Sequence, residues 1–227
     1  MRRLPTSSSE IIQIASKSLL SLGALLIFVG VANGAPVTDP SALAPGAMLI
    51  DFEQFAAGQA FGPSLTIGSV TFTSVTAELS ILDVAASGWA ANGTEVAGKT
   101  LFPGGEPDSA IAISFANPVA QFLLGWGDPT FAGNILRAYD AGGNLLEETA
   151  VPFDSGNTAA WVGFVRPTND IAKIVVQPVQ PLPSGDDYVI DNILYRTNAR
   201  VPEPATVSLF AIGATVCAAL RRRTPGR

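Results

Sequence analysis

Short stretches of alternating or β-branched residues recur along the middle of the chain, and no long segment has the apolar spacing of an amphipathic helix. The pattern predicts β-strands at residues 48–52, 65–74, 111–115, 119–124, 135–139, 145–151, 161–165, 171–177 and 188–195. Turn-forming Gly, Asn, Asp and Pro fill the joints, as at Asn117-Pro118 and in residues 140–144. Many short strands with regular turns predict an all-β fold, a single β-sandwich of the jelly-roll type.

One part of the middle region interrupts this pattern. Residues 87–108 are rich in Gly, Ala and polar side chains. We expect long loops there, with a short strand near residues 99–102.

The N-terminal end has the parts of an export signal. Arg2 and Arg3 give a basic start, residues 19–31 form an apolar run, and small residues and Pro36 follow. The segment resembles a Sec signal peptide, with cleavage after Ala32 or within the next three residues, so we assign residues 1–35 to it. An uncleaved N-terminal anchor is the alternative.

The C-terminal end combines a Pro-Glu-Pro tripeptide, a short apolar run and an arginine cluster. Residues 207–220 make about 21 Å of helix, which is short for a hydrocarbon core of about 30 Å but spans it with local thinning. Arginines after a transmembrane helix hold the C-terminus in the cytoplasm and leave the folded part outside. The residues of the tripeptide motif and the cluster are Val201, Pro202, Glu203, Pro204, Arg221, Arg222 and Arg223.

This order of parts resembles the PEP-CTERM sorting signal of Gram-negative bacteria. The resemblance implies that a membrane-embedded exosortase recognises residues 201–227 and cleaves near the tripeptide. Pro202 and Pro204 keep the backbone extended, which presents Glu203 to a protease. After export and cleavage, the resemblance implies a place at the cell surface or in the extracellular matrix. A plain C-terminal anchor with an accidental Pro-Glu-Pro is the alternative.

The region between the two ends, residues 36–200, has the size of one domain. Five pieces in order, residues 50–53, 68–72, 113–119, 136–144 and 188–193, resemble the ectodomains commonly found before this sorting signal. Those ectodomains are similar in outline to carbohydrate-binding jelly rolls. The likeness implies a fold and transfers no ligand.

The charge of this domain excludes some partners. Of the chain's 19 acidic and 13 basic residues, 17 and 6 lie within residues 36–200, a balance of −11. Such a balance argues against binding nucleic acid or anionic lipid and suits divalent cations. The one cysteine, Cys217, lies in the apolar tail, so the domain has no disulfide.

Acidic residues near the first and last strands form a candidate calcium site. In carbohydrate-binding jelly rolls a structural calcium often joins a carboxylate near the first strand to an Asp in the last, and the resemblance implies that Asp51 or Glu53 meets Asp191 in this way. Calcium takes six to eight oxygens, so carbonyls and Asp186 or Asp187 would contribute. Alternation places Asp187 and Asp191 on one strand face. The alternative is that these carboxylates face solvent or cap a turn.

Catalytic residues are not predicted. The chain has no histidine and the domain has no cysteine, which excludes Ser-His-Asp and Cys-His catalysis and zinc sites built on those ligands. A carboxylate-dependent glycoside hydrolase would need two converging acids, and Glu147-Glu148 is more simply explained as a solvated strand end.

Aromatic residues are candidates for sugar binding, because sugars stack on exposed rings. Trp161 and Tyr139 lie in apolar strands and are predicted to pack in the core. Trp89 and Trp126 are flanked by glycine and polar residues, and we predict that these two are exposed and bind ligand. The alternative is that each loop is tucked under its own tryptophan.

The sequence thus favours a non-catalytic, exosortase-processed protein of the cell surface or extracellular matrix, associated with exopolysaccharide or biofilm. A lectin-like carbohydrate-binding module is the second hypothesis and a glycoside hydrolase the third.

Overall fold

The structure, a computed structural model, describes residues 35–75, 78–87, 95–104, 109–127, 132–153, 159–179 and 187–197. All of them belong to the unit Asn33–Arg227. The predicted signal peptide, apart from Ala35, and the predicted sorting signal lie outside the described residues, so neither is tested by the fold. The domain limits 36–200 remain a prediction, and strand β1 includes Ala35.

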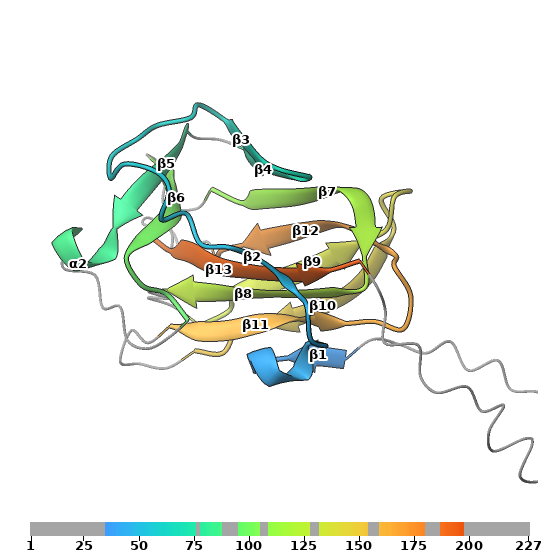
Figure 1. Ribbon diagram of the computed structural model, residues 1–227. Coiled ribbons are helices and arrows are strands. Elements are labelled where there is room, and N and C mark those ends of the chain that lie inside the picture. Colours follow the sequence, from blue (N-terminus) through green and yellow to red (C-terminus); the bar gives the residue numbers. More distant parts are fainter. Residues whose placement is uncertain are drawn as a thin grey trace, which may run out of the picture. The chain divides into compact units, whose positions relative to one another are not determined.

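Two antiparallel sheets make up the described part, and in Figure 1 strands β8, β11 and β13 lie in front of β9, β10 and β12. Sheet A runs in the order β1 (Ala35–Val37), β11 (Ala160–Val165), β8 (Gln121–Gly127), β13 (Val189–Arg196), β6 (Lys99–Gly104) and β5 (Glu78–Asp83), with β2 (Met48–Ile50) also paired to β13. Sheet B runs in the order β10 (Leu145–Ala150), β9 (Ile135–Tyr139), β12 (Ile171–Gln177), β7 (Ile111–Val119), β4 (Val70–Ser74) and β3 (Ser64–Ile67). Two short helices, η1 (Pro40–Ala42) and α2 (Val84–Ser87), complete the described elements.

The core lies between the sheets, where apolar residues of both inner faces meet. Phe115 of sheet B packs edge-on against Phe122 of sheet A, with ring centroids 5.9 Å apart. Trp126 stacks on Tyr188 at 4.8 Å, and the Tyr188 hydroxyl donates to the carbonyl of Ser109 at 2.7 Å. Large aromatic side chains contribute most of the apolar area of such a core. The predicted single β-sandwich is therefore confirmed.

Most predicted strands correspond to observed ones, but the single strand predicted at residues 65–74 is a hairpin of two antiparallel strands, β3 and β4. Strands β9 and β12 have the predicted limits, and the predicted strand near residues 99–102 is β6. The joint predicted at Asn117-Pro118 is wrong, because β7 continues to Val119. A register shift opposite β12 lets the strand pass through the proline. Strand β5 was not predicted.

The outer faces of the two sheets differ. Every residue of β8 is buried, including those that alternate away from the core, such as Gln121 and Leu123. Near η1 the chain crosses this face, and the N–H of Ala44 donates to Oε1 of Gln121 at 2.9 Å. At the other end of β8 a second cover is formed by residues 95–98, which we call the covering turn. The candidate site lies beneath it.

Candidate functional site

The covering turn can lie on sheet A because the strand beneath it has glycine at two alternate positions. A Cβ placed on Gly125 would come within 1.8 Å of the carbonyl oxygen of Glu95, and one on Gly127 would lie 3.1 Å from the methyl groups of Val96. Val96 packs with Val84 and Val189 in a small apolar cluster on this outer face. A glycine in a strand often marks the close approach of another backbone, and here the approach is that of the covering turn.

The covering turn and the first residue of β6 bind two carboxylates through their backbone N–H groups. The N–H of Ala97 donates to Oδ2 of Asp191 at 3.1 Å, and the N–H of Lys99 donates to Oε1 of Glu53 at 2.8 Å. The Lys99 ammonium lies 3.6 Å from Oε2 of Glu53. Glu53 and Asp191, which are 138 positions apart in the chain, are thereby both bound to the short segment of residues 97–99.

The pairing of β2 with β13 explains why three of the predicted acids lie in the same part of the sheet. Ile50 lies opposite Ile193 in the antiparallel register, so the residues after Ile50 run alongside those before Ile193. Phe52 has a φ of 56° and turns into the core, where its ring packs edge-on against that of Phe72, with ring centroids 5.5 Å apart. Asp51 and Glu53, on either side of it, are exposed. The structure therefore brings Asp51, Glu53 and Asp191 to the same part of sheet A.

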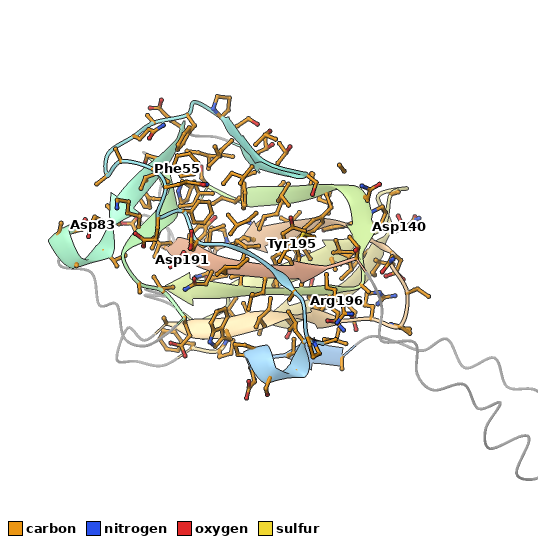
Figure 2. All side chains as sticks on the ribbon, viewed as in Figure 1. Phe55, Asp83, Asp140, Asp191, Tyr195 and Arg196 are labelled. Atoms are coloured by element: carbon orange, nitrogen blue, oxygen red, sulfur yellow. The ribbon has the colours of Figure 1, made fainter. Side chains whose placement is uncertain are left out.

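Asp191 is the buried member of this group, with 1% of its surface exposed, and Figure 2 shows it on β13. A register shift follows it, and Asn192 has a φ of 48°, which directs its side chain back to the site. Nδ2 of Asn192 donates to the carbonyl of Glu95 at 3.2 Å and to Oδ2 of Asp191 at 3.3 Å. In contrast, Oδ1 of Asp191 is buried and has no hydrogen-bond partner.

The position of Asp191 changes its acidity. Burial raises the pKa of the Asp191 carboxyl to about 7, because a charged group loses its hydration there. The backbone N–H groups of Ala97 and Asn192 oppose this rise, and the negative charges of Glu53 and Asp51 add to it. The folded chain therefore favours the neutral form of this carboxyl more than water does.

The fourth predicted calcium ligand, Asp187, does not share this environment. It precedes β13 and is exposed, whereas Asp191 is buried. The strand begins at Val189, after Asp187, so the expectation that Asp187 and Asp191 share one strand face stays a prediction. Among the described residues no three acidic side chains converge closely enough, as they stand, to hold a metal ion.

One residue that the sequence did not single out belongs to this site. Glu95 contributes the carbonyl that accepts from Asn192, and Oε2 of its side chain is buried with no hydrogen-bond partner. It lies in a stretch predicted only as loop. Its role depends on the covering turn reaching β8, a long-range contact that no local pattern signals.

The two tryptophans predicted as an exposed pair do not form one in the described structure. Trp126 is fully buried in β8, so the prediction that it binds ligand on an exposed loop is wrong. Its flanking glycines allow the covering turn to approach and do not form a turn themselves. Trp89 lies outside the described residues.

The carboxylates considered for glycoside hydrolysis are engaged in ion pairs. Oε2 of Glu147 lies 3.3 Å from Nη1 of Arg166. Arg166 also donates two hydrogen bonds to Asp170, from Nε to Oδ1 at 2.6 Å and from Nη2 to Oδ2 at 2.9 Å. Burial raises the pKa of Glu147, and the hydrogen bond and charge of Arg166 oppose the rise. Glu148 pairs with Arg137 at 2.6 Å. The explanation of Glu147 as a solvated strand end is wrong, since it belongs to a largely buried network that joins β10 to the turn after β11.

The segment that follows β13 matches a known family. Residues 200–223 match the family described as PEP-CTERM protein-sorting motif. The chain carries a PEP-CTERM sorting signal. This confirms the resemblance drawn from the tripeptide, the apolar run and the arginines.

The PEP-CTERM signal begins close to the end of the sandwich, because β13 ends at Arg196 and the match starts at residue 200. In the part of the chain that the structure describes, no helix has the length and apolar character needed to cross a membrane. The predicted span, residues 207–220, lies outside that part.

Other comparisons give distant similarities to solved structures. The K2 cleaved adhesin domain of Lys-gingipain is 10% identical, with a TM-score of 0.43 over 66% of this chain and 98% of that one. The family 29 carbohydrate-binding module CBM29_1 from Piromyces equi is 12% identical, with a TM-score of 0.38 over 72% of this chain and 99% of that one. Similarity at this level says nothing of what this chain binds. No curated protein matches the chain.

Proposed function

We propose that this chain is an exported, non-catalytic protein of the cell surface or extracellular matrix of a Gram-negative bacterium, sorted and cleaved by an exosortase. The observation that carries the proposal is the PEP-CTERM match at residues 200–223, directly after the last strand of a folded sandwich. In this proposal the β-sandwich is the exported protein and the tail is the signal that directs its sorting.

The short connection between the sandwich and its signal constrains how cleavage occurs. Only residues 197–201 separate the end of β13 from Pro202, and five residues span at most about 18 Å when fully extended. The sandwich must therefore stand close to the membrane surface when the protease acts. A predicted transmembrane segment at residues 207–220 would hold the substrate there until cleavage.

Replacing Pro202, Glu203 and Pro204 together by alanine tests this proposal. We expect the fold to be unchanged and the variant to stay in the membrane fraction at full length, because the protease loses its extended recognition segment. Replacing Pro181 and Pro183, a second Pro-X-Pro in the same chain, is the matched control and should be processed like the parent. Equal processing of all three proteins on a gel would contradict the proposal.

Association with exopolysaccharide or biofilm is part of the same proposal. The acidic domain, with a balance of −11, is suited to a hydrated matrix and unsuited to nucleic acid or anionic lipid. The expected observation is that processed protein co-sediments with the polysaccharide fraction of the producing cells. Free protein in the medium, with none in that fraction, would contradict this part alone.

The alternative is a carbohydrate-binding module, and the described residues lend it little support. Trp126 is buried, and Tyr139, a half-buried ring on the outer face of sheet B, has the Lys173 ammonium 4.8 Å above it. A sugar would have to displace this lysine to stack on the ring. The prediction that Tyr139 and Trp161 pack in the core is wrong, because both rings are only half-buried. The alternative then depends on Trp89 and Trp161, and loss of glycan binding in Trp89→Ala would favour it.

A glycoside hydrolase is the least supported function. Glu147 pairs with Arg166 and Glu148 pairs with Arg137, whereas a glycosidase needs two carboxyl groups that flank one scissile bond. Release of reducing sugar from matrix polysaccharide by the purified protein, lost in Glu147→Gln, would overturn the non-catalytic assignment.

A further inference from the structure

The first and last described strands begin and end on the same side of sheet A. Ala35, at the start of β1, lies opposite Val165 of β11. Val165 lies opposite Gln121 of β8, which in turn lies opposite Arg196 at the end of β13. Three strand spacings of about 4.8 Å put Ala35 roughly 14 Å from Arg196. The folded chain therefore begins and ends at one end of the sandwich, which we call the Arg196 end.

Backbone hydrogen bonds fix the last residue of β13 to this end. The N–H of Ala120 donates to the carbonyl of Arg196 at 2.9 Å, and the N–H of Arg166 donates to the carbonyl of Ala120 at 2.8 Å. Ala120 alone joins β7 of sheet B to β8 of sheet A, and the turn that begins at Arg166 joins β11 to β12. Two short connections between the sheets thus lie at the Arg196 end.

A further turn and the strand lengths define the two ends of the sandwich. Strand β9 also finishes at the Arg196 end, since Tyr139 lies opposite Lys173, two residues after the start of β12. The turn of residues 140–144 follows, and Figure 2 shows Asp140 towards the same side as Arg196. Strands β8 and β12 have seven residues each, which span about 20 Å at about 3.3 Å per residue. The far end of the sandwich is therefore about 20 Å away.

Short connections join both predicted membrane segments to the Arg196 end. Residues 32–34 separate the N-terminal apolar run from β1, and residues 197–201 separate β13 from the Pro-Glu-Pro motif. Fully extended, three residues span at most about 11 Å and five at most about 18 Å, which is less than the length of about 20 Å between the two ends. Neither connection can therefore reach the membrane if the far end of the sandwich stands on it.

Exposed apolar side chains gather at the Arg196 end. The described chain exposes five large apolar side chains, and three of them lie here. Met48 of β2 lies opposite Tyr195, with Leu49 beside it. Leu145 begins β10, directly after the turn that follows β9. At a lipid interface these side chains would lose contact with water, which is favourable.

The charges of the Arg196 end are balanced. The turns and strand ends described there carry two arginines, Arg166 and Arg196, and two aspartates, Asp140 and Asp170. Arg166 pairs with Asp170 at 2.6 Å, and the guanidinium of Arg196 donates to the carbonyl of Pro45. The acidic excess of the domain is thus not concentrated at this end, and a membrane surface does not repel it.

We propose that the Arg196 end is the membrane-facing surface of the sandwich and rests on the lipid headgroups from export until exosortase cleavage. This inference rests on the proposed function, because it takes residues 207–220 as the membrane segment. The signals at the two ends of the chain then hold the folded domain from one side and do not pull it in opposite directions. The far end, where β8 and β12 finish, is the end presented to the matrix.

The test uses the full chain with Cys217→Ser, purified from cells without the exosortase and placed in vesicles of phosphatidylethanolamine and phosphatidylglycerol. A fluorophore is attached to one new cysteine at an exposed site, either Asn169→Cys at the Arg196 end or Val75→Cys at the far end. The N–H of Val75 donates to the carbonyl of Ala110, just before β7 begins. Nitroxide-headgroup lipids should quench the Asn169 probe at least about threefold more than the Val75 probe, because the sites lie about 20 Å apart along the strands.

A second pair of sites, beside the two ends of one strand, is the matched control for tilt. Leu145→Cys lies at the start of β10, and Phe153→Cys lies shortly after its end at Ala150. Both native side chains are exposed and apolar. We expect the Leu145 probe to be quenched more strongly than the Phe153 probe. A sandwich that lies on its side would quench both members of each pair equally, and this result would overturn the inference.

Failure of this inference is distinguishable from failure of the proposed function. If the protein stays with the vesicles but the far-end probes are quenched equally or more strongly, the orientation alone is overturned. If neither the parent nor Cys217→Ser sediments with the vesicles, residues 207–220 do not insert, and the proposed function is overturned together with the inference.

Discussion

The outer faces of the two sheets have the same alternation of residues but different surroundings. On sheet A, Gln121, Leu123 and Asp191 are at most 1% exposed, because two chain segments lie across them, although all three alternate away from the core. On sheet B the corresponding positions, such as Ser114 and Lys173, are partly exposed. The covered face must satisfy its polar groups within the protein, whereas the open face has water.

The open face of sheet B satisfies its polar side chains by lateral pairs. The hydroxyls of Thr66 and Thr71 lie 3.1 Å apart on β3 and β4, and Arg137 pairs with Glu148 across β9 and β10. Such exposed pairs contribute little to stability. The covered face is therefore where single substitutions should have large effects, and where an unpartnered group such as Oδ1 of Asp191 requires an explanation.

The largest difference between the faces is expected for a large apolar residue. Leu123→Ala on sheet A should lower the free energy of unfolding by about 3 kcal/mol, because it leaves a cavity under the cover. Val175→Ala on the open face of sheet B should lower it by less than about 1 kcal/mol. Urea unfolding of both variants measures this, and equal losses would show that sheet A is not effectively covered.

A glycine substitution tests the cover itself. In Gly125→Ala the new methyl group meets the backbone oxygens of Glu95 and Asp191, so the covering turn must move, and we expect a loss of about 2 to 3 kcal/mol. The control is Gly142→Ala, whose new methyl would meet only the ends of two side chains, Nδ2 of Asn144 at 3.1 Å and Oδ1 of Asp140 at 3.3 Å. Hydrogen exchange at residues 95–99 should become faster in the first variant alone. Unchanged protection there would disprove the covering role.

The covered carboxylate also predicts an unusual pH dependence of stability. The pKa of Asp191 is raised to about 7 in the folded chain, above the ordinary value of 3.8, so the folded chain binds the proton more tightly. Its contribution to the free energy of unfolding should therefore increase by about 2 kcal/mol as the pH falls from 8 to 5. The measurement is the parent's pH profile minus that of Asp191→Asn. A contribution of Asp191 to the free energy of unfolding that decreases as the pH falls would contradict the prediction.

The smallest effect is expected for an ion pair on the open face. Arg137→Ala removes the partner of Glu148, and both side chains are partly exposed. We expect a loss below about 1 kcal/mol that shrinks further in 0.5 M salt, because exposed pairs are screened. A loss as large as that of Leu123→Ala would mean that the two faces do not differ as described.

The sequence predicted most of the sandwich and part of the site. Strands β9 and β12 were predicted at their observed limits, since their alternation reflects one buried face. Strand β5 was missed because the charged Glu78 and Asp83 shorten its apolar run. The resemblance that pairs the first and last strands predicted that Asp51 lies near Asp191, and β2 does pair with β13; that the two carboxylates hold a metal ion stays a prediction.

What the sequence did not predict arises from long-range covering contacts. The glycines beside Trp126 indicated a loop, but they provide room for a segment about 30 residues away. The same contact buries Trp126 within a central strand and brings Glu95 to Asp191. No local pattern distinguishes a glycine needed for a turn from one needed for a neighbouring backbone.

The most direct test of the central claim is the mass of the mature C-terminus. The full chain would be expressed in a host of its own type, with and without the exosortase. We predict a C-terminus near Pro202 to Ala205 when the exosortase is present, and an intact chain ending at Arg227 when it is absent. An intact C-terminus in both strains would contradict the account, and the protein would then be a sandwich on a plain membrane anchor.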